Sequence, residues 1–126
     1  MKKHLPYSHP AQPDRPKQIY HMLPTEVYEC IKNQEFYTPE DYADDGFIHF
    51  SLKEQLVDVA TSCYGMHQKL CVLEVLVDDS LIKYLKMEGV TADNLYPHLY
   101  TPLPLCKVHA VHRMVQSKLY GFQLII

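Results

Sequence analysis

The chain has 126 residues, 47% of them hydrophobic, and a formal net charge of −3. This length suffices for one hydrophobic core without disulfides, and the small charge, with no block of like charges, excludes bulk attraction to a nucleic-acid backbone. No apolar run reaches the roughly 20 residues that cross a bilayer. We therefore expect no nucleic-acid partner and no membrane partner.

Proline-rich residues 1–17, "MKKHLPYSHPAQPDRPK", contain almost no aliphatic side chains and predict a flexible leader, followed by a single domain over residues 18–126. No apolar segment follows the first lysines, so no secretory signal is predicted. The four cysteines stand in apolar or helical contexts without CxxC spacing, which favours buried free thiols and a reducing, cytoplasmic location. They are Cys30, Cys63, Cys71 and Cys106.

The first half of the domain predicts two strands and two helices. "QIYHML" (18–23) is typical of a strand, and Pro24 then begins a helix of roughly ten residues. A polar loop follows over 34–45, and "FIHFS" (47–51) predicts a short strand.

The second helix begins at Ser51, which with Glu54 forms a capping box. Its apolar stripe runs to Cys63, and Gly65 ends it.

The second half consists mostly of strands. "LCVLEVLV" (70–77) is apolar on both faces, as a central buried strand is. Residues 82–88 alternate as a half-exposed strand does, and 108–114 and 119–126 predict two more strands. The order of elements predicts an α+β domain with two main helices on a strongly curved, mostly antiparallel sheet.

Three histidines stand inside apolar segments and are the candidate functional residues. His21 lies mid-strand, where a buried imidazole needs a hydrogen-bonding partner. His49 shares a strand face with Ser51, next to a helix N-terminus that favours an anion. His98 lies between prolines and tyrosines in what we expect to be a rigid loop, and Tyr100 joins it as a pocket wall. For each of these residues a purely structural role stays open.

Other chemistry has weaker support. Glu74, among aliphatic residues, is expected to pair structurally, although it could also act as an acid or base. His109 and His112 are three apart and face opposite ways in a strand, so we predict no metal site, with zinc bound by three histidines as an open alternative. Ser51 lacks the glycines of a nucleophile elbow.

Three blocks in the same order, "IYHML", "GFIHFSLKEQ" and "LYPHLYTPL", resemble the bacterial family catalogued as domain of unknown function number 952, over residues 18 to about 115. That family is similar to the ADP-ribosyltransferases, whose split, curved sheet surrounds an NAD cleft. The resemblance implies that His21 contacts the ribose on the nicotinamide side. It also implies that His49 and Ser51 lie where the superfamily binds nicotinamide.

The chain departs from the transferases of that superfamily at one point that matters. Their catalytic glutamate on a late strand has no counterpart in "VHAVHRM" (108–114). RNA 2′-phosphotransferases lack that glutamate too, but they use arginines, and Arg113 is the only arginine of the predicted domain.

We therefore expect an NAD- or nucleotide-dependent transferase, ADP-ribosyl- or phosphotransferase-like, with a histidine-lined cleft. His21, His49, Ser51 and His98 are its expected catalytic residues, and His21, His49, Ser51 and Tyr100 its expected cofactor-binding residues. The alternative is a non-catalytic ligand-binding or interaction domain on the same fold. In both cases the expected partner is a small molecule or nucleotide.

Overall fold

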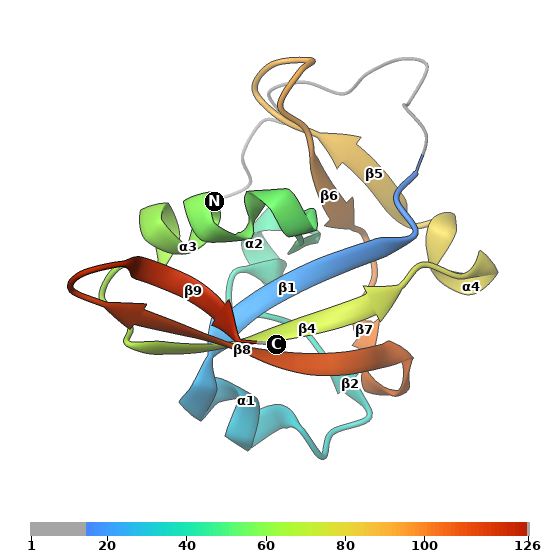
Figure 1. Cartoon of the computed structure of the whole chain (residues 1–126). Helices are drawn as coiled ribbons and strands as arrows, with labels where there is room; N and C mark the ends of the chain where they lie inside the picture. The colour runs from blue at the N-terminus through green and yellow to red at the C-terminus, as the bar shows by residue number, and fades with distance from the viewer. Residues whose placement is uncertain (1–14, 126) are drawn as a thin grey trace.

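The computed structural model describes residues 15–125, so most of the predicted leader lies outside the described residues. A four-stranded antiparallel sheet forms the centre of the molecule (Figure 1). Its order is β1-β4-β8-β9, with bounds Gln18–Pro24, Lys69–Leu76, Val108–Ser117 and Gly121–Ile125. All four strands were predicted, and β4 is an inner strand, as its two apolar faces indicated.

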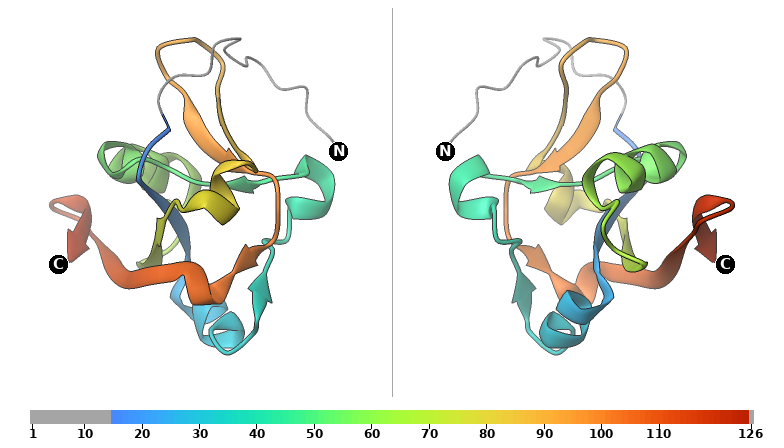
Figure 2. Two further views of the ribbon diagram at one scale, coloured as in Figure 1. Left: turned by 90° about the vertical axis from the view of Figure 1, so that its right-hand side faces the viewer. Right: turned by 90° about the vertical axis from the view of Figure 1, so that its left-hand side faces the viewer.

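Two small sheets complete the β structure, both antiparallel. The three-stranded sheet has the order β3-β6-β5, with bounds Ile48–His49, Tyr96–Leu99 and Leu85–Glu88. The two-stranded sheet pairs β2, Phe36–Tyr37, with β7, Leu103–Pro104. The β5–β6 hairpin and the first helix lie at opposite ends of the molecule (Figure 2).

The prediction of a loop around His98 was wrong, because His98 lies in β6, the middle strand of the three-stranded sheet. Pro97 was the reason for predicting a loop, since proline has no N–H to donate to a sheet. The Pro97 carbonyl still accepts the Phe50 N–H at 3.0 Å, so the proline removes a donor without ending the pairing.

The helices are short. Their bounds are Thr25–Ile31 for α1, Tyr42–Asp45 for α2, Leu56–Cys63 for α3 and Asp79–Ile82 for α4, with 3-10 turns at Lys53–Gln55 (η1) and Leu105–Lys107 (η2). The helix after Pro24 is shorter than predicted, and α4 replaces the start of the strand predicted at 82–88. The Asp78 carboxylate begins α4 by accepting the N–H groups of Ser80 and Leu81 at 3.0 and 3.1 Å.

The predicted capping box at Ser51 was also wrong. The backbone of Ser51 pairs with Tyr20 of β1 in a single bridge, with N–O distances of 2.7 and 2.9 Å. The capping contact belongs to the next residue, because the Leu52 N–H donates to Gln55 Oε1 at 2.8 Å. Ser51 therefore extends the edge of the large sheet instead of beginning a helix.

Two hydrophobic clusters occupy the two faces of the large sheet. One side of β1, with Ile19 and Leu23, packs with residues of the small sheets, and the other side, with Tyr20 and Met22, packs against α3. This division follows the period-2 alternation of a strand. His21 lies on the first side, which places it against the small sheets.

The architecture is therefore a mixed α+β fold with mostly antiparallel sheets and few helices, as predicted. No helix of the described residues combines the length and the hydropathy needed to cross a membrane. The four cysteines are free thiols, but only Cys71 is buried. The expectation of buried thiols was wrong for Cys30, Cys63 and Cys106, which are exposed.

Candidate functional site

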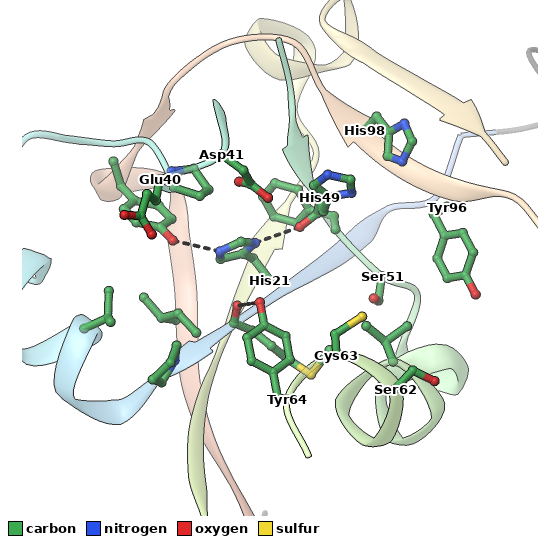
Figure 3. Close-up of a pocket in the computed structure, with 18 of the residues that line it drawn as sticks. His21, Glu40, Asp41, His49, Ser51, Ser62, Cys63, Tyr64, Tyr96 and His98 are labelled. Carbon is green, nitrogen blue, oxygen red and sulfur yellow. Dashed lines mark hydrogen bonds between the residues drawn. The ribbon is translucent and has the colours of Figure 1, made fainter. Parts of the chain in front are cut away.

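A cavity of about 860 Å³ lies beside β1, an edge strand of the large sheet, between the three-stranded sheet, α2 and α3. It contains four of the five residues singled out from the sequence: His21, His49, Ser51 and His98 (Figure 3). The fifth, Tyr100, is not among the described residues that line it. Segments from β1, β3 and β6 thus bring three imidazoles around one hollow.

His21 is buried and has both ring nitrogens engaged. Its Nδ1–H donates to the His49 carbonyl at 2.7 Å, and the Tyr37 hydroxyl lies 2.9 Å from Nε2. A carbonyl can only accept, so the proton is on Nδ1 and the Tyr37 O–H donates to Nε2. Burial lowers the pKa of His21 to about 4, which keeps the ring neutral at pH 7.

His49 is the exposed member of the group. Its Nε2 lies 2.8 Å from the Asp45 carboxylate, and its ring stands edge-on to His98 with the centroids 5.3 Å apart. The main chain of His49 therefore holds His21, while its side chain remains half in solvent at the mouth of the cavity.

His98 faces His49 across the β3–β6 pair and is buried. Its ring stacks on Phe47, with centroids 4.0 Å apart and planes 16° from parallel. Its Nδ1 lies 2.9 Å from Glu88 Oε1, which also accepts the Tyr100 O–H at 2.6 Å. Burial lowers the pKa of His98, and the hydrogen bond to Glu88 only partly offsets this effect.

Tyr37 and Glu88 are site residues that the sequence did not reveal. Tyr37 stands in a polar segment that predicted a loop, and Glu88 ends an alternating strand, where a carboxylate ordinarily faces water. Glu88 is the last residue of β5, where it pairs with Tyr96 of β6, and it is only 1% exposed. No local sequence signal distinguishes this burial from a solvated strand end.

Ser51 is buried on the cavity wall, and its hydroxyl has no hydrogen-bond partner within residues 15–125. Its place near the histidines follows from the bridge to Tyr20. The 3-10 turn η1 begins two residues later, at Lys53, so the anion site expected beside a helix start stays a prediction.

The charges around the cavity are negative. The described lining residues include no lysine and no arginine, whereas four carboxylates are present, all on exposed residues: Glu40, Asp41, Asp44 and Asp58. Such a mouth attracts cations and repels polyanions, because a cleft of one sign focuses the local potential.

The residues that could hold a metal ion also lie at this mouth. Asp41, Asp45 and His49 each offer one ligand atom, and these atoms lie within 4.8 Å of one another. Two carboxylates and an imidazole suit a divalent cation. This set differs from the three-histidine site that the sequence left open.

A second histidine–glutamate pair lies away from the cavity. The Glu74 carboxylate on β4 lies 2.7 Å from His112 Nε2 on β8, and neither residue lines the cavity. The structural pairing expected for Glu74 is confirmed, with a partner in the neighbouring strand.

The fold and the cavity define a small α+β protein with a histidine-lined pocket. Residues 22–111 match the model of a family described as "Protein of unknown function (DUF952)", so the chain belongs to this family. The family resemblance seen in the sequence is thereby confirmed. No match to a curated protein was found.

Solved structures of one relative are similar to the whole described fold. The crystal structure of protein CC0527 from Caulobacter crescentus is 29% identical, with a TM-score of 0.71 over 84% of this chain and 93% of that one. The solution structure of the same protein is 27% identical, with a TM-score of 0.69 over 84% and 90% of the two chains.

Proposed function

We propose that the cavity binds a nucleoside-type small molecule, with the nicotinamide–ribose end of NAD as the best-fitting class. The convergence of His21, His49, Ser51 and His98 on one cavity carries this proposal. The volume of about 860 Å³ falls within the range of ligand pockets, roughly 300–1,000 Å³.

The lining favours the nicotinamide end over the phosphates. An oxidised nicotinamide ring is cationic and aromatic, which suits a mouth with carboxylates at Glu40, Asp41 and Asp58. A diphosphate carries two negative charges that no described lysine or arginine of the lining compensates. We therefore place the phosphates outside the cavity. The same charge argument disfavours 2′-phosphotransferase chemistry.

The proposed reaction is ADP-ribosyl transfer, in keeping with the ADP-ribosyltransferase-like sheet that the family resemblance implies. The N-glycosidic bond breaks, nicotinamide leaves with the electron pair, and the ribose carbon bonds to an acceptor oxygen. A second candidate is binding without turnover. It is favoured by His21, whose two nitrogens are already committed within the protein, and by the absence of a glutamate on β8.

A blocking variant with a matched control tests the binding. Ser62→Trp places an indole at a lining position of α3, whereas Thr61→Trp places it at the neighbouring exposed position, which does not line the cavity. We expect nicotinamide riboside to raise the melting temperature of the wild type and of Thr61→Trp, but not of Ser62→Trp. A ligand at ten times its Kd stabilises by about 1.4 kcal/mol.

ADP-ribose, which lacks the cationic ring, is expected to give a smaller shift than nicotinamide riboside. If neither compound nor NAD shifts the melting temperature at millimolar concentration, the proposal is wrong. Release of nicotinamide from NAD by the wild type, lost in Ser62→Trp, indicates the transferase. Binding without release indicates the second candidate.

A further inference from the structure

We propose that Glu88 is a positioning residue that makes His98 the proton acceptor of the cavity: it holds the Nδ1–H and leaves the Nε2 lone pair for an O–H or N–H of the ligand. The inference rests on the proposed function in so far as the cavity is the ligand site. The state of the His98 ring can be measured without any ligand.

The contacts of Glu88 define where the proton of His98 lies. Glu88 Oε1 is 2.9 Å from His98 Nδ1 and 2.6 Å from the Tyr100 hydroxyl. A carboxylate oxygen has no proton to give, so the Tyr100 O–H and the His98 Nδ1–H both donate to it. His98 is then the Nδ1–H tautomer, and its Nε2 has no hydrogen-bond partner among the described residues.

Packing fixes the direction of that lone pair. The imidazole stacks on Phe47 and meets the edge of His49, which hold its plane, and turning the ring over within that plane would break the contact with Glu88. His98 lines the cavity, and Nε2 is the nitrogen left to meet a ligand. Figure 3 shows its ring near His49 and Tyr96, above Ser51.

His21 and His49 are less suited than His98 to accept a proton from a ligand. His21 has its lone pair occupied by the Tyr37 O–H. His49 is held by Asp45 in a similar way, but its side chain is 51% exposed, against 10% for His98. Water therefore competes for the His49 lone pair far more than for that of His98.

Only one of the two carboxylate oxygens of Glu88 is hydrogen-bonded among the described residues. Its second oxygen, Oε2, is buried without a hydrogen-bond partner among the described residues. A buried carboxylate with one oxygen unsatisfied is costly, and such a group calls for a reason. Compensation of an imidazolium formed at His98 is such a reason, because the charge pair forms only when the proton has moved.

In the proposed transfer the O–H bond of the acceptor breaks, its proton moves to His98 Nε2, and its oxygen bonds to the ribose carbon as nicotinamide leaves. Glu88 keeps its negative charge throughout and faces the imidazolium across Nδ1. A carboxylate behind an imidazole that acts as base is a recurring arrangement for holding the correct tautomer.

The test is ¹⁵N-edited NMR of the histidine side chains at pH 7.5 in the ligand-free protein, with the His98 signals assigned from His98→Gln. We expect a protonated Nδ1 and a non-protonated Nε2 at His98. In Glu88→Gln the amide can present either an oxygen or an NH₂ group, so we expect a mixture of tautomers. Glu74→Gln changes a matched carboxylate outside the cavity and is expected to alter only His112.

An Nε2–H tautomer in the wild type overturns the proposal, whether or not the variants fold, and so does a Glu88→Gln spectrum unchanged at His98. A second measurement brings in the ligand: His98→Gln is expected to weaken nicotinamide riboside binding about tenfold. Unchanged affinity in His98→Gln contradicts the role of His98. If the wild type does not bind the ligand, the proposed function fails while the tautomer result still stands or falls by itself.

Discussion

Two histidine–glutamate pairs in the molecule show how surroundings decide what a contact does. The N–O distance is 2.9 Å in the His98–Glu88 pair and 2.7 Å in the His112–Glu74 pair. The exposed side-chain fractions are 10% and 1% in the first pair and 25% and 13% in the second. The longer contact is the more buried one, and only it borders the cavity. Distance alone therefore does not rank the two pairs.

The difference arises from what covers each pair. Phe47 stacks on His98, and Tyr100 adds a second donor to Glu88, so water is excluded and every hydrogen bond must come from the protein. His112 and Glu74 join two strands of the large sheet where water still reaches both residues. We therefore expect that removing one partner lowers the free energy of unfolding strongly in the His98–Glu88 pair and only slightly in the His112–Glu74 pair.

The largest loss of stability is expected when Glu88 is replaced, and the same replacement at Glu74 is the comparison. Glu88→Ala leaves the His98 Nδ1–H and the Tyr100 hydroxyl without an acceptor, and breaking a buried pair costs about 3–5 kcal/mol. Glu74→Ala is expected to cost about 1 kcal/mol or less, because its pair remains partly hydrated. Urea unfolding measures both, and equal losses would refute the comparison.

The next prediction concerns the pH dependence of stability. It extends the comparison to His21, a buried histidine whose hydrogen-bond partners are a carbonyl and a hydroxyl and not a carboxylate. The folded-state pKa of His21 is lowered from 6.5 to about 4, chiefly by desolvation. Between about pH 6.5 and pH 4 the unfolded chain therefore binds a proton at His21 that the folded chain does not bind. The free energy of unfolding is unaffected by this group above about pH 6.5 and falls as the pH drops, and the loss reaches about 3 kcal/mol at pH 4.

Unfolding curves of the wild type and His21→Gln between pH 7 and pH 4 check this dependence. His21→Gln is expected to lose stability with a shallower slope than the wild type. Groups near His21, namely His49, Asp41 and Tyr37, are common to both proteins. Parallel curves for the two would show that His21 does not carry the effect.

A smaller effect is expected from Tyr37→Phe. The variant leaves His21 Nε2 buried without its donor, which costs about 1–2 kcal/mol. Tyr64→Phe is the control, since the Tyr64 hydroxyl makes only a 3.2 Å bond to the Met22 carbonyl, at a half-buried position. Thermal unfolding should place Tyr37→Phe below Tyr64→Phe, and the reverse order would contradict the role given to Tyr37.

The smallest effect is expected from Tyr100→Phe. Glu88 keeps its bond to His98 and loses one donor, so we expect a cost of about 1 kcal/mol and no change in the His98 tautomer. Tyr84→Phe, at an exposed position, is the control and should be close to neutral. A loss of 3 kcal/mol or more in Tyr100→Phe, on the scale expected for Glu88→Ala, would mean that Tyr100, rather than the pair with His98, dominates the network.

Elements with strong local patterns were predictable, and those built from short pairings were not. The strands that contain His21 and Glu74 were evident from alternation and from a continuous apolar run. The two-residue strands β2 and β7 cannot produce a period, and Pro97 gave a misleading signal for β6, whereas β3 lies within the short strand predicted at 47–51. Their pairing depends on partners distant in the sequence.

The site was predictable to the extent that unusual residues marked it. An imidazole in an apolar segment is conspicuous, so His21, His49 and His98 could be selected, and the cavity brings them together. The partners of these histidines are ordinary residues in ordinary places, such as Glu88 at a strand end. Tyr100 was selected with them, but it does not line the cavity and contacts the site through Glu88 and Phe47.

The sequence by itself determined the two faces of β1 and the inner position of β4, because these follow from the order of side chains along one strand. Only the tertiary structure decided which histidine keeps a lone pair, since that depends on which partner atom lies within about 3 Å of each nitrogen. Hydrogen bonds of this kind join residues such as His98 and Glu88 across separate strands. Their geometry exists only after the sheets have packed.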